Sequence, residues 1–247
     1  MRIRLRAGAG RLARHVELLI FPSFCRLCSR PLGRSREKIV CQECLASLSP
    51  RRGPVCLCCG RFFEGAGDDH LCARCLDRVP PYTVQRSCGR YDGVLKELIL
   101  LFKYGRVSIL RRPLARFAAA ALDAEDGLWL GADLLVPVPL HPRRKRERGF
   151  NQSQLLAKEL ARIRGMRVLE GCLVKVRNVP PQTSLEAAGR EKNVRGAYAV
   201  RREARVKGKV VVLVDDVFTT GSTLAECGLV LKRAGAREVR ALTLAQA

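Results

Sequence analysis

The sequence has 247 residues, enough for one sizeable domain and a small one, and its 47% of apolar residues can form a packed core. The formal net charge of +23 indicates an anionic partner, such as a nucleic acid, a phosphorylated metabolite or an anionic membrane surface. An arginine-rich, solvated surface of the kind that a GC-rich genome produces would give the same balance. No run of eighteen apolar residues occurs, so no transmembrane helix is expected. Nothing in the sequence marks the chain for secretion. We therefore expect a cytoplasmic protein.

Residues 1–21 are rich in arginine and end in a short apolar stretch, Leu18 to Phe21. No small-residue cleavage site follows, so the pattern does not fit a transit or signal peptide. It predicts an amphipathic leading helix whose apolar end packs on the segment that follows.

Eight of the twelve cysteines form four CxxC pairs, namely Cys25/Cys28, Cys41/Cys44, Cys56/Cys59 and Cys72/Cys75. Both halves have the spacing C-x2-C-x12-C-x2-C, and the second repeats the first with an offset of 31 residues at all four positions. The two-residue spacing lets a tight turn present two thiolates to one tetrahedral ion, and two such turns complete a four-cysteine site. The sequence therefore predicts two tandem zinc ribbons, each with one structural Zn²⁺.

Other uses of these cysteines fit less well. A disulfide framework is not expected without a secretory signal, and a redox-active motif would not need two matched copies. Pairing in sequence order is the simplest arrangement, but the spacing alone also permits a crossed one, with the first pair joined to the third and the second to the fourth. We expect Cys58 to be an extra thiol beside a ligand, His70 to be a surface residue, and Cys88, Cys172 and Cys227 to lie in the core.

After Cys75, Pro80 and Pro81 interrupt any regular element and mark a linker. The rest of the chain alternates between apolar strand patterns and amphipathic helix patterns, which is typical of an α/β domain with a mainly parallel sheet and helices on both faces. Strands are expected at 87–91, 133–140, 173–176, 197–200, 210–214 and 238–244, and helices at 93–104, 109–122, 151–164 and 223–234. The predicted domains are residues 1–80, with the leading helix and ribbons, and residues 81–247.

The segment 210–224 reads VVVLVDDVFTTGSTL. Five consecutive apolar residues without alternation predict a central strand covered on both faces. Ligands of parallel α/β sheets bind beyond the carboxyl ends of the strands, which is where Asp215 and Asp216 are expected. Two adjacent carboxylates disfavour a phosphate but suit a sugar diol or a cation.

The turn after the aspartates suits a phosphate. Backbone N–H groups that open a helix form an anion nest, hydroxyl groups add donors, and Gly221 lets the backbone approach closely. The residues of this turn are Thr219, Thr220, Gly221, Ser222 and Thr223. The segment thus predicts a site for a phosphorylated sugar. A Walker B strand also ends in acids, but no GxxxxGK[ST] motif is present, and an ordinary capped turn would not need two acids.

This stretch resembles the phosphoribosyl pyrophosphate (PRPP) signature of type I phosphoribosyltransferases. The resemblance implies that Asp215 and Asp216 contact the ribose 2′ and 3′ hydroxyls and are the catalytic residues, while the turn binds the 5′-phosphate. It also implies a type I phosphoribosyltransferase-like fold.

The whole chain resembles the ComF family of competence-associated, amidophosphoribosyltransferase-like proteins. The resemblance rests on the CxxC ribbons, on Phe102 to Gly105, on VPVPLHPRRKRERGFNQSQLLA at 136–157, and on the PPQTSL…R…NVRGAY pattern at 180–198. It implies a role in natural transformation beside a membrane-associated DNA-import helicase.

The segment 136–157 stands where the related enzymes have their pyrophosphate loop. Residues 143–148 hold five cations in six positions, which suits a pyrophosphate or a polynucleotide backbone, and the alternative is a solvated loop before a helix. The anion-binding candidates are His141, Arg143, Arg144 and Arg148, with His141 either donating to a phosphate or packing. Amidophosphoribosyltransferases have Asp-Ser-Gly after VPVP, whereas Leu140 to Pro142 stands here. This departure bears on turnover more than on PRPP binding.

The polar segment from Lys175 to Arg195 is expected to form a hood over the site, as the flexible loop of the fold does, with a surface hairpin as the alternative. The residues that match the family pattern are Arg177, Gln182, Arg190 and Asn193. A closing lid would exclude water from a reactive ribosyl cation.

The resemblance implies displacement of pyrophosphate from PRPP by a nitrogen nucleophile, with Mg²⁺ bridging the pyrophosphate oxygens. No pocket for a purine or pyrimidine is identifiable, so the sequence names no acceptor. Two functions follow from the sequence. One is a zinc-ribbon phosphoribosyltransferase. The other is a PRPP-responsive competence factor that binds single-stranded DNA and retains the fold without turnover.

Overall fold

The computed structural model describes residues 23–32, 39–177, 194–201 and 203–247. The chain divides into two compact units, Met1–Leu48 and Ser49–Ala247. The leading helix expected over residues 1–21 lies outside the described residues.

The first unit contains the first cysteine repeat. An antiparallel bridge between Phe24 and Pro31 closes the turn that holds the first CxxC pair. The second pair lies at the start of helix α2 (Gln42–Ala46), where Cys41 is the N-cap and its sulfur accepts a hydrogen bond from the backbone N–H of Cys44. The first CxxC pair thus sits in a tight turn, as the ribbon pattern predicts, whereas the second is presented by the first turn of a short helix.

The second unit is built on a five-stranded sheet in the order β1-β7-β6-β2-β3, in which every pairing is parallel. Its strands are β1 (Val84–Arg90), β2 (Leu134–Pro137), β3 (Arg167–Val168), β6 (Val210–Phe218) and β7 (Glu238–Gln246). A separate antiparallel pair consists of β4 (Leu173–Lys175) and β5 (Tyr198–Val200). The parallel sheet confirms the α/β class expected from the alternation of patterns.

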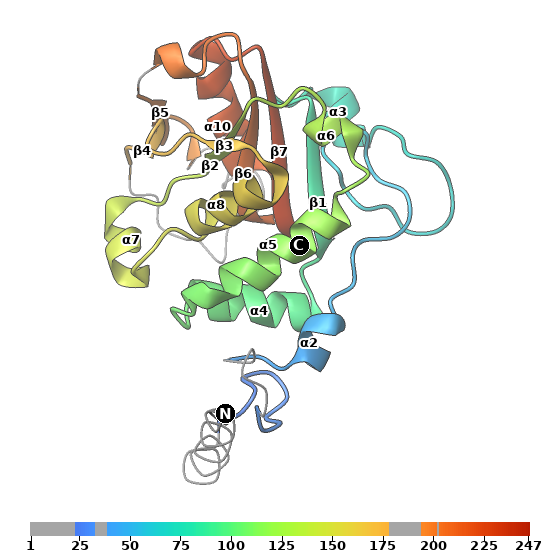
Figure 1. The fold of residues 1–247 in the computed structure, drawn as a ribbon. Helices are drawn as coiled ribbons and strands as arrows, with labels where there is room; N and C mark the ends of the chain where they lie inside the picture. Colours follow the sequence, from blue (N-terminus) through green and yellow to red (C-terminus); the bar gives the residue numbers. More distant parts are fainter. Residues whose placement is uncertain (1–22, 33–38, 178–193, 202) are drawn as a thin grey trace, which may run out of the picture. The chain divides into compact units, whose positions relative to one another are not determined.

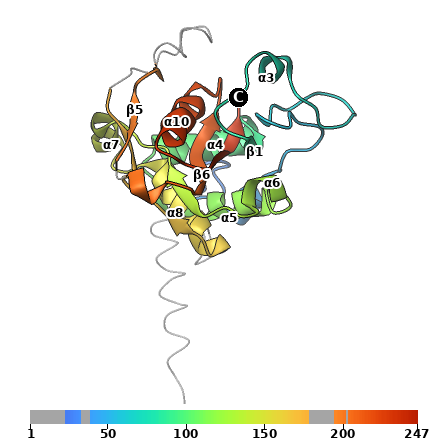
Figure 2. The ribbon, with the colours of Figure 1, turned by 90° about the horizontal axis from the view of Figure 1, so that it is seen from above.

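Helices connect the parallel strands and cover both faces of the sheet. Among the described residues they are α4 (Gly93–Lys103), α5 (Arg111–Ala121), α6 (Asp126–Trp129), α7 (Pro142–Arg148), α8 (Gln152–Arg164) and α10 (Ser222–Arg233), with short 3-10 turns at Ser108–Leu110 and Glu203–Arg205. Helix α3 (Ala73–Asp77) precedes β1 and belongs to the second cysteine repeat. Figures 1 and 2 show α10 on one side of the strands and α5 and α8 on the other. Both faces of β6 are therefore buried.

The sequence of β6 explains its central position. All five residues from Val210 to Val214 are at most 2% exposed, because alternate side chains enter the cores on opposite faces of the sheet. Val211 and Leu213 join the cluster that contains Leu224 and Leu231 of α10. The same cluster includes Cys56, Cys59, Cys72 and Cys75.

The second cysteine repeat is thus part of the core of the α/β unit. This unit begins at Ser49 and includes the second ribbon, whereas the sequence motifs alone suggested a boundary at residue 80. Pro80 and Pro81 do connect the ribbon to β1, but the connection is short and Tyr82 beside them is 4% exposed. The second ribbon, before Pro80, and the sheet, after Pro81, therefore share one hydrophobic core.

Most expected elements are present with ends displaced by a few residues. Among the helices and strands of the described residues, five were not expected: α2, α3, α6, β3 and α7. The expected end of the central strand at Val214 is wrong, since β6 continues through both aspartates to Phe218, paired with β7 as far as Gln246. Hydrogen bonding to β7 extends β6 beyond Val214, where the run of apolar residues ends. Within the described part of the chain, no helix combines the length and the apolar character needed to cross a membrane.

Candidate functional site

The eight CxxC cysteines form two clusters, Cys25/Cys28/Cys41/Cys44 and Cys56/Cys59/Cys72/Cys75, in each of which all sulfur atoms lie within 4.8 Å of one another. Sulfur–sulfur distances of 3.9 Å (Cys25 to Cys44), 3.6 Å (Cys28 to Cys41) and 3.7 Å (Cys59 to Cys72) are close to the ~3.8 Å that a tetrahedron with Zn–S bonds of about 2.3 Å requires. Each cluster belongs to one repeat, so the pairing follows sequence order and the crossed alternative is excluded. Four thiolates at this spacing fit Zn²⁺.

The remaining cysteines and His70 lie where the sequence places them. Cys88, Cys172 and Cys227 are buried, while the Cys58 thiol is half-buried and donates to the carbonyl of Tyr82. Burial raises the pKa of Cys58, which keeps it a thiol beside the second cluster. His70 is exposed, and its ring stacks on Phe63 at 4.0 Å between ring centroids.

The hydroxyl-rich turn lies between β6 and α10, at the carboxyl edge of the sheet. Gly221 precedes the first residue of α10 with a φ of +78°, and a Cβ there would lie 2.9 Å from the ring of Phe218. Thr220 and Ser222 share a hydrogen bond of 2.8 Å between their hydroxyls. Thr219 is exposed, and Thr223 is half-buried in the first turn of α10. Glycine is thus required for the tight turn that opens the helix.

The two carboxylates have different surroundings. The Oδ1 of Asp215 accepts from the Ser153 hydroxyl at 2.9 Å and from the backbone N–H of Asp216 at 2.9 Å. Burial and the neighbouring Asp216 raise the pKa of Asp215 to about 7. Asp216 instead forms an ion pair with Lys103, at 2.8 Å between Oδ1 and Nζ. Within the described residues these donors all lie on Oδ1 atoms, so the Oδ2 atoms of both aspartates can accept from a ligand.

Lys103 belongs to the candidate site, although the sequence analysis did not assign it a role there. It ends α4, and its side chain is only 14% exposed. Burial alone lowers the pKa of Lys103, but the charge and hydrogen bond of Asp216 outweigh it and the net shift is upward. The signal was available, because Lys103 follows the buried Ile99 by one helical turn, and a lysine on an apolar face needs an acidic partner.

Ser153 was missed for a different reason. Asn151 caps α8, accepting at 3.0 Å from the backbone N–H of Ser153, and its side-chain amide donates at 3.0 Å to the carbonyl of Val138. This anchors the start of α8 to the end of β2, beside β6. Ser153 is thereby held against Asp215 by a pairing of strands that no local pattern reveals.

The basic segment 143–148 was expected to form a loop, but it forms most of helix α7. Pro142 occupies its first turn, the Nδ1 of His141 accepts from the backbone N–H of Arg143 at 3.3 Å, and Gly149 ends it with a φ of +83°. Residues 143–148 are all good helix formers, and no glycine interrupts them. The segment therefore coils. His141 serves as a cap, which favours the packing alternative over donation to a phosphate.

The arginines of α7 do not converge on one point. Arg143 pairs with Glu147 at 3.2 Å on the exposed side, and Arg148 donates to Gln152 and lies 5.0 Å from the centroid of Tyr104. Burial and the charge of Arg144 lower the pKa of Lys175, and the ring of Tyr198 lies 5.2 Å from the Lys175 ammonium. Of this group, Arg144 lies near Lys175, whose pKa the charge of Asp215 also affects.

The polar hood segment is flanked by β4 and β5, which pair from Leu173 with Val200 to Lys175 with Tyr198. Arg177 donates to the carbonyl of Arg195 across the base of this hairpin. The other hood candidates, Gln182, Arg190 and Asn193, lie outside the described residues. The flanking strands are thus confirmed, while the roles of the four hood residues stay predictions.

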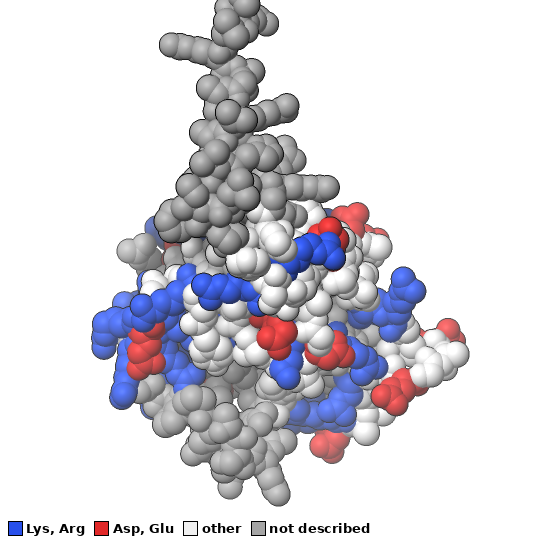
Figure 3. Space-filling model, turned by 90° about the horizontal axis from the view of Figure 1, so that it is seen from below, with Lys and Arg blue, Asp and Glu red and all other residues white. Residues whose placement is uncertain are grey.

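One face of the molecule shows how charged side chains are distributed on it. Figure 3 shows one face on which Lys and Arg side chains lie between other residues, with Asp and Glu side chains among them. On this face the charge is not gathered into a single patch.

Comparison with known proteins identifies both cysteine repeats as one kind of domain and the C-terminal part of the chain as another. A model of the double zinc ribbon domain matches residues 17–76, and a model of the phosphoribosyl transferase domain matches residues 149–247. DNA utilization protein YhgH of Salmonella typhimurium is 36% identical over 226 residues, which cover 90% of this chain and 96% of that protein. Competence protein F of Haemophilus influenzae is 32% identical over 197 residues, covering 78% and 85%, and competence protein ComFC of Bacillus subtilis is 27% identical over 212 residues, covering 83% of each chain.

Relatives of this similarity extend over both the cysteine repeats and the α/β unit, and the two domain models match in the order that the motifs predict. The chain therefore belongs to the ComF family, with an N-terminal double zinc ribbon and a phosphoribosyltransferase-type domain.

Proposed function

We propose that the chain binds PRPP at the carboxyl edge of β6 and transfers its phosphoribosyl group to a nitrogen nucleophile, with release of pyrophosphate. The observation that carries this proposal is the convergence of Asp215, Asp216 and Lys103 beside the Thr219–Thr223 turn. The Oδ2 atoms, which accept no hydrogen bond from the described residues, suit the two ribose hydroxyls as acceptors, and the N–H groups at the start of α10 suit the 5′-phosphate.

In the proposed reaction the bond from C1 of ribose to the pyrophosphate oxygen breaks, and a C1–N bond forms. The ribose ring gains positive charge in the transition state, which the nearby carboxylates stabilise. Pyrophosphate leaves with the bonding electron pair, and the nucleophile loses a proton to solvent or base. Mg²⁺, if bound with PRPP, would neutralise charge on the pyrophosphate. Positioning and charge stabilisation thus account for the catalysis that these residues offer.

PRPP affinity should rise with pH through about 7. Ribose hydroxyls donate to an ionised carboxylate, and the pKa of Asp215 is raised to about 7, so a growing fraction of the free protein is competent as the pH rises. The same raised pKa means that ionisation of Asp215 costs stability, which is fully present below the unfolded pKa and is lost as the pH approaches 7. Calorimetric titration with PRPP between pH 5.5 and 8.5 measures the affinity.

Asp215→Asn is the control for titration of the ligand, because the phosphates of PRPP also titrate, with a pKa of about 6. The variant should bind more weakly and keep only the part of the pH dependence that belongs to the ligand. Parallel pH profiles for the wild type and Asp215→Asn would show that Asp215 does not titrate in binding.

Gly221→Ala should weaken PRPP binding more than tenfold. Alanine at a φ of +78° is strained by about 1–3 kcal/mol, and its Cβ would also meet the Phe218 ring, so the turn must shift. Gly208→Ala is a matched control, with a φ of +71° and open space around the Cβ. It should lose similar stability in thermal unfolding and bind PRPP as the wild type does. Equal PRPP affinities of the two variants would argue against the role of the turn.

A second candidate function is favoured by α7. Helix and His141 cap stand where amidophosphoribosyltransferases have a glycine-containing loop, so the backbone cannot wrap a pyrophosphate in the same way. A PRPP-responsive competence factor that binds single-stranded DNA without turnover would need the Asp215/Asp216 site but not that loop. The names of the relatives, DNA utilization protein and competence protein, support a role in DNA uptake under either function. Work beside a membrane-associated DNA-import helicase rests on the family resemblance alone.

Pyrophosphate release from PRPP separates the two functions. Wild type and Asp215→Ala/Asp216→Ala are assayed with Mg²⁺, with and without single-stranded DNA; water serves as nucleophile when no amine is added, leaving ribose 5-phosphate. Release that the double substitution abolishes supports transfer. No release from a wild type that still binds PRPP would sink the transferase and leave the binding function.

A further inference from the structure

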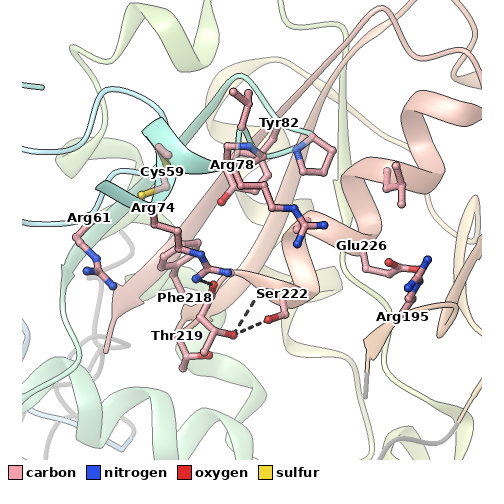
Figure 4. Close-up of a pocket in the computed structure, with 18 of the residues that line it drawn as sticks. Cys59, Arg61, Arg74, Arg78, Tyr82, Arg195, Phe218, Thr219, Ser222 and Glu226 are labelled. Atoms are coloured by element: carbon pink, nitrogen blue, oxygen red, sulfur yellow. Dashed lines mark hydrogen bonds between the residues drawn. The ribbon is translucent and has the colours of Figure 1, made fainter. Parts of the chain in front are cut away.

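The turn at the carboxyl end of β6 is hydrogen-bonded to the second zinc ribbon. Arg74 lies on α3, and its guanidinium donates to the carbonyl of Thr220. Figure 4 shows this side chain reaching from the ribbon toward Phe218 and the turn. Thr220 stands between β6 and α10, so its carbonyl takes part in neither element. In the described part of the chain, no hydrogen bond other than that from Arg74 reaches this carbonyl.

Arg74 is itself held between two zinc ligands. Cys72 is the N-cap of α3, and Cys75, which is 4% exposed, follows Arg74 directly. The backbone N–H of Cys75 donates to the carbonyl of Cys72 at 2.9 Å, and the N–H of Arg78 donates to the carbonyl of Arg74 at 3.0 Å. Four thiolates on one Zn²⁺ would therefore fix the helical turn that bears the guanidinium. A group whose backbone is already ordered loses less entropy when it forms a contact.

The ribbon is also hydrogen-bonded to the strands that lead to the site. The carbonyl of Cys58 accepts from the backbone N–H of Gln85 in β1 at 2.7 Å. The N–H of Phe62 donates at 2.8 Å to the Oε1 of Gln246, which pairs with Phe218 where β7 runs beside β6. The ribbon, and with it the guanidinium on α3, is therefore fixed relative to the end of β6.

The bond to the Thr220 carbonyl sets the direction of the next N–H group. The carbonyl and the N–H of a trans peptide point in opposite directions, and no cis peptide occurs among the described residues. With the Thr220 carbonyl directed at Arg74, the N–H of Gly221 points away from the guanidinium. Glycine adopts positive and negative φ about equally well, so Gly221 by itself would let this peptide plane rotate. Arg74 therefore selects one of its orientations.

This orientation matters for an anionic ligand. A nest binds an anion when successive backbone N–H groups converge on it. Gly221 is the N-cap of α10 and offers no side chain to the N–H groups of the first helical turn. If the peptide between Thr220 and Gly221 were reversed, it would present a carbonyl oxygen to the phosphate in place of an N–H donor. The contact from the ribbon thus keeps the turn in the form that binds an anion.

We propose that Arg74 is a positioning residue of the PRPP site, through which the second zinc ribbon keeps the Gly221 N–H directed at the 5′-phosphate. The identity of the ligand in this inference rests on the proposed function, whereas the contact between ribbon and turn does not. PRPP affinity then depends on the ribbon in a second way, beyond the part of the core that the ribbon supplies.

Calorimetric titration of zinc-loaded Arg74→Ala with PRPP tests the proposal, and Arg52→Ala is the matched control. Both are exposed arginines of the α/β unit, and each change removes one positive charge. Both variants should retain two zinc ions. Arg74→Ala should lose at least tenfold in affinity for PRPP and Arg52→Ala less than twofold. Arg74→Lys, which keeps a charged donor on a long side chain, should bind PRPP more tightly than Arg74→Ala does.

Hydrogen exchange of the ligand-free protein measures the state of the turn without PRPP. The N–H of Ala225 donates to the carbonyl of Gly221 at 2.8 Å, so this first bond of α10 adjoins the peptide plane that Arg74 holds. In Arg74→Ala, a peptide covering residues 219–226 should exchange faster than in the wild type, whereas peptides from β1 should not change. Arg52→Ala should exchange as the wild type does in both regions.

Faster exchange together with weaker PRPP binding in Arg74→Ala supports the proposal. Wild-type affinity in this variant would overturn it and leave the PRPP site itself standing. Weaker binding with unchanged exchange would make Arg74 a direct ligand of the phosphate, and equal losses in Arg52→Ala would show a general effect of charge; either result overturns the positioning role. Faster exchange in a protein that does not bind PRPP would support the control of the turn by Arg74 and refute the proposed function.

Discussion

Cys75→Ser should unfold the α/β unit, whereas Cys44→Ser, at the equivalent position of the first repeat, should leave it folded. Cys75 is 4% exposed, and its cluster is part of the core that contains Leu231 and Phe218. Structural zinc contributes roughly 10–16 kcal/mol to small zinc domains, which matches or exceeds the total stability of about 5–15 kcal/mol of a typical domain. Loss of the second zinc therefore removes metal and core packing together.

The single tryptophan makes this comparison simple to measure. Trp129 lies in α6 of the α/β unit, so its fluorescence during urea unfolding reports on this unit alone. Each variant should hold about one zinc per chain by metal analysis, against about two for the wild type. The Trp129 transition should be lost or strongly shifted to lower urea in Cys75→Ser and unchanged in Cys44→Ser. Equal transitions in both variants would contradict the inclusion of the second ribbon in this core.

Lys103→Met should destabilise the α/β unit by about 3–5 kcal/mol, because it leaves the Asp216 carboxylate buried without its cation. The two side chains are 14% and 13% exposed and pair at 2.8 Å. Methionine keeps the length and apolar stem of lysine, so the loss reports on the charge. The measurement is the free energy of unfolding in urea at pH 7.5, followed by Trp129 fluorescence.

Asp216→Asn in the Lys103→Met background is the informative partner. Neutralising the orphaned carboxylate should recover most of the stability, and the coupling in this double-mutant cycle should reach a few kcal/mol, as expected for residues in contact (about 0.5–3 kcal/mol). PRPP binding should not recover, because the single and the double variant both lack the Asp216 carboxylate paired with the Lys103 ammonium. Additive effects of the two substitutions on stability would mean that the ion pair does not couple them.

Local patterns were sufficient for the zinc clusters and for the central strand. The repeated C-x2-C-x12-C-x2-C spacing identifies the eight ligands, although only the structure decides between sequential and crossed pairing, and the run from Val210 to Val214 predicts a strand with cover on both faces. Gly221 could be placed in the turn because a residue with positive φ is needed where a strand gives way to a helix. These features depend on residues close in sequence.

Features that depend on contacts between segments distant in sequence could not be predicted from local patterns. β6 continues to Phe218 because β7 pairs with it, and Ser153 meets Asp215 because Asn151 ties α8 to β2. The resemblance to a loop-containing family obscured the high helix propensity of 143–148, which the residues themselves carry. Burial of the second ribbon depends on contacts across Pro80 and Pro81.

Direct titration of PRPP into the zinc-loaded protein, with Mg²⁺ present at pH 7.5, tests the central claim that Asp215 and Asp216 form a PRPP site. The wild type should bind one PRPP per chain, and Asp215→Asn/Asp216→Asn should bind at least a hundredfold more weakly while retaining two zinc ions. Its Trp129 unfolding transition should stay cooperative but move to lower urea, because Lys103 loses its partner. Glu203→Gln, an exposed acid remote from the turn in sequence, should bind as the wild type does. A folded double variant with wild-type affinity for PRPP, or a wild type that does not bind PRPP, would contradict the account.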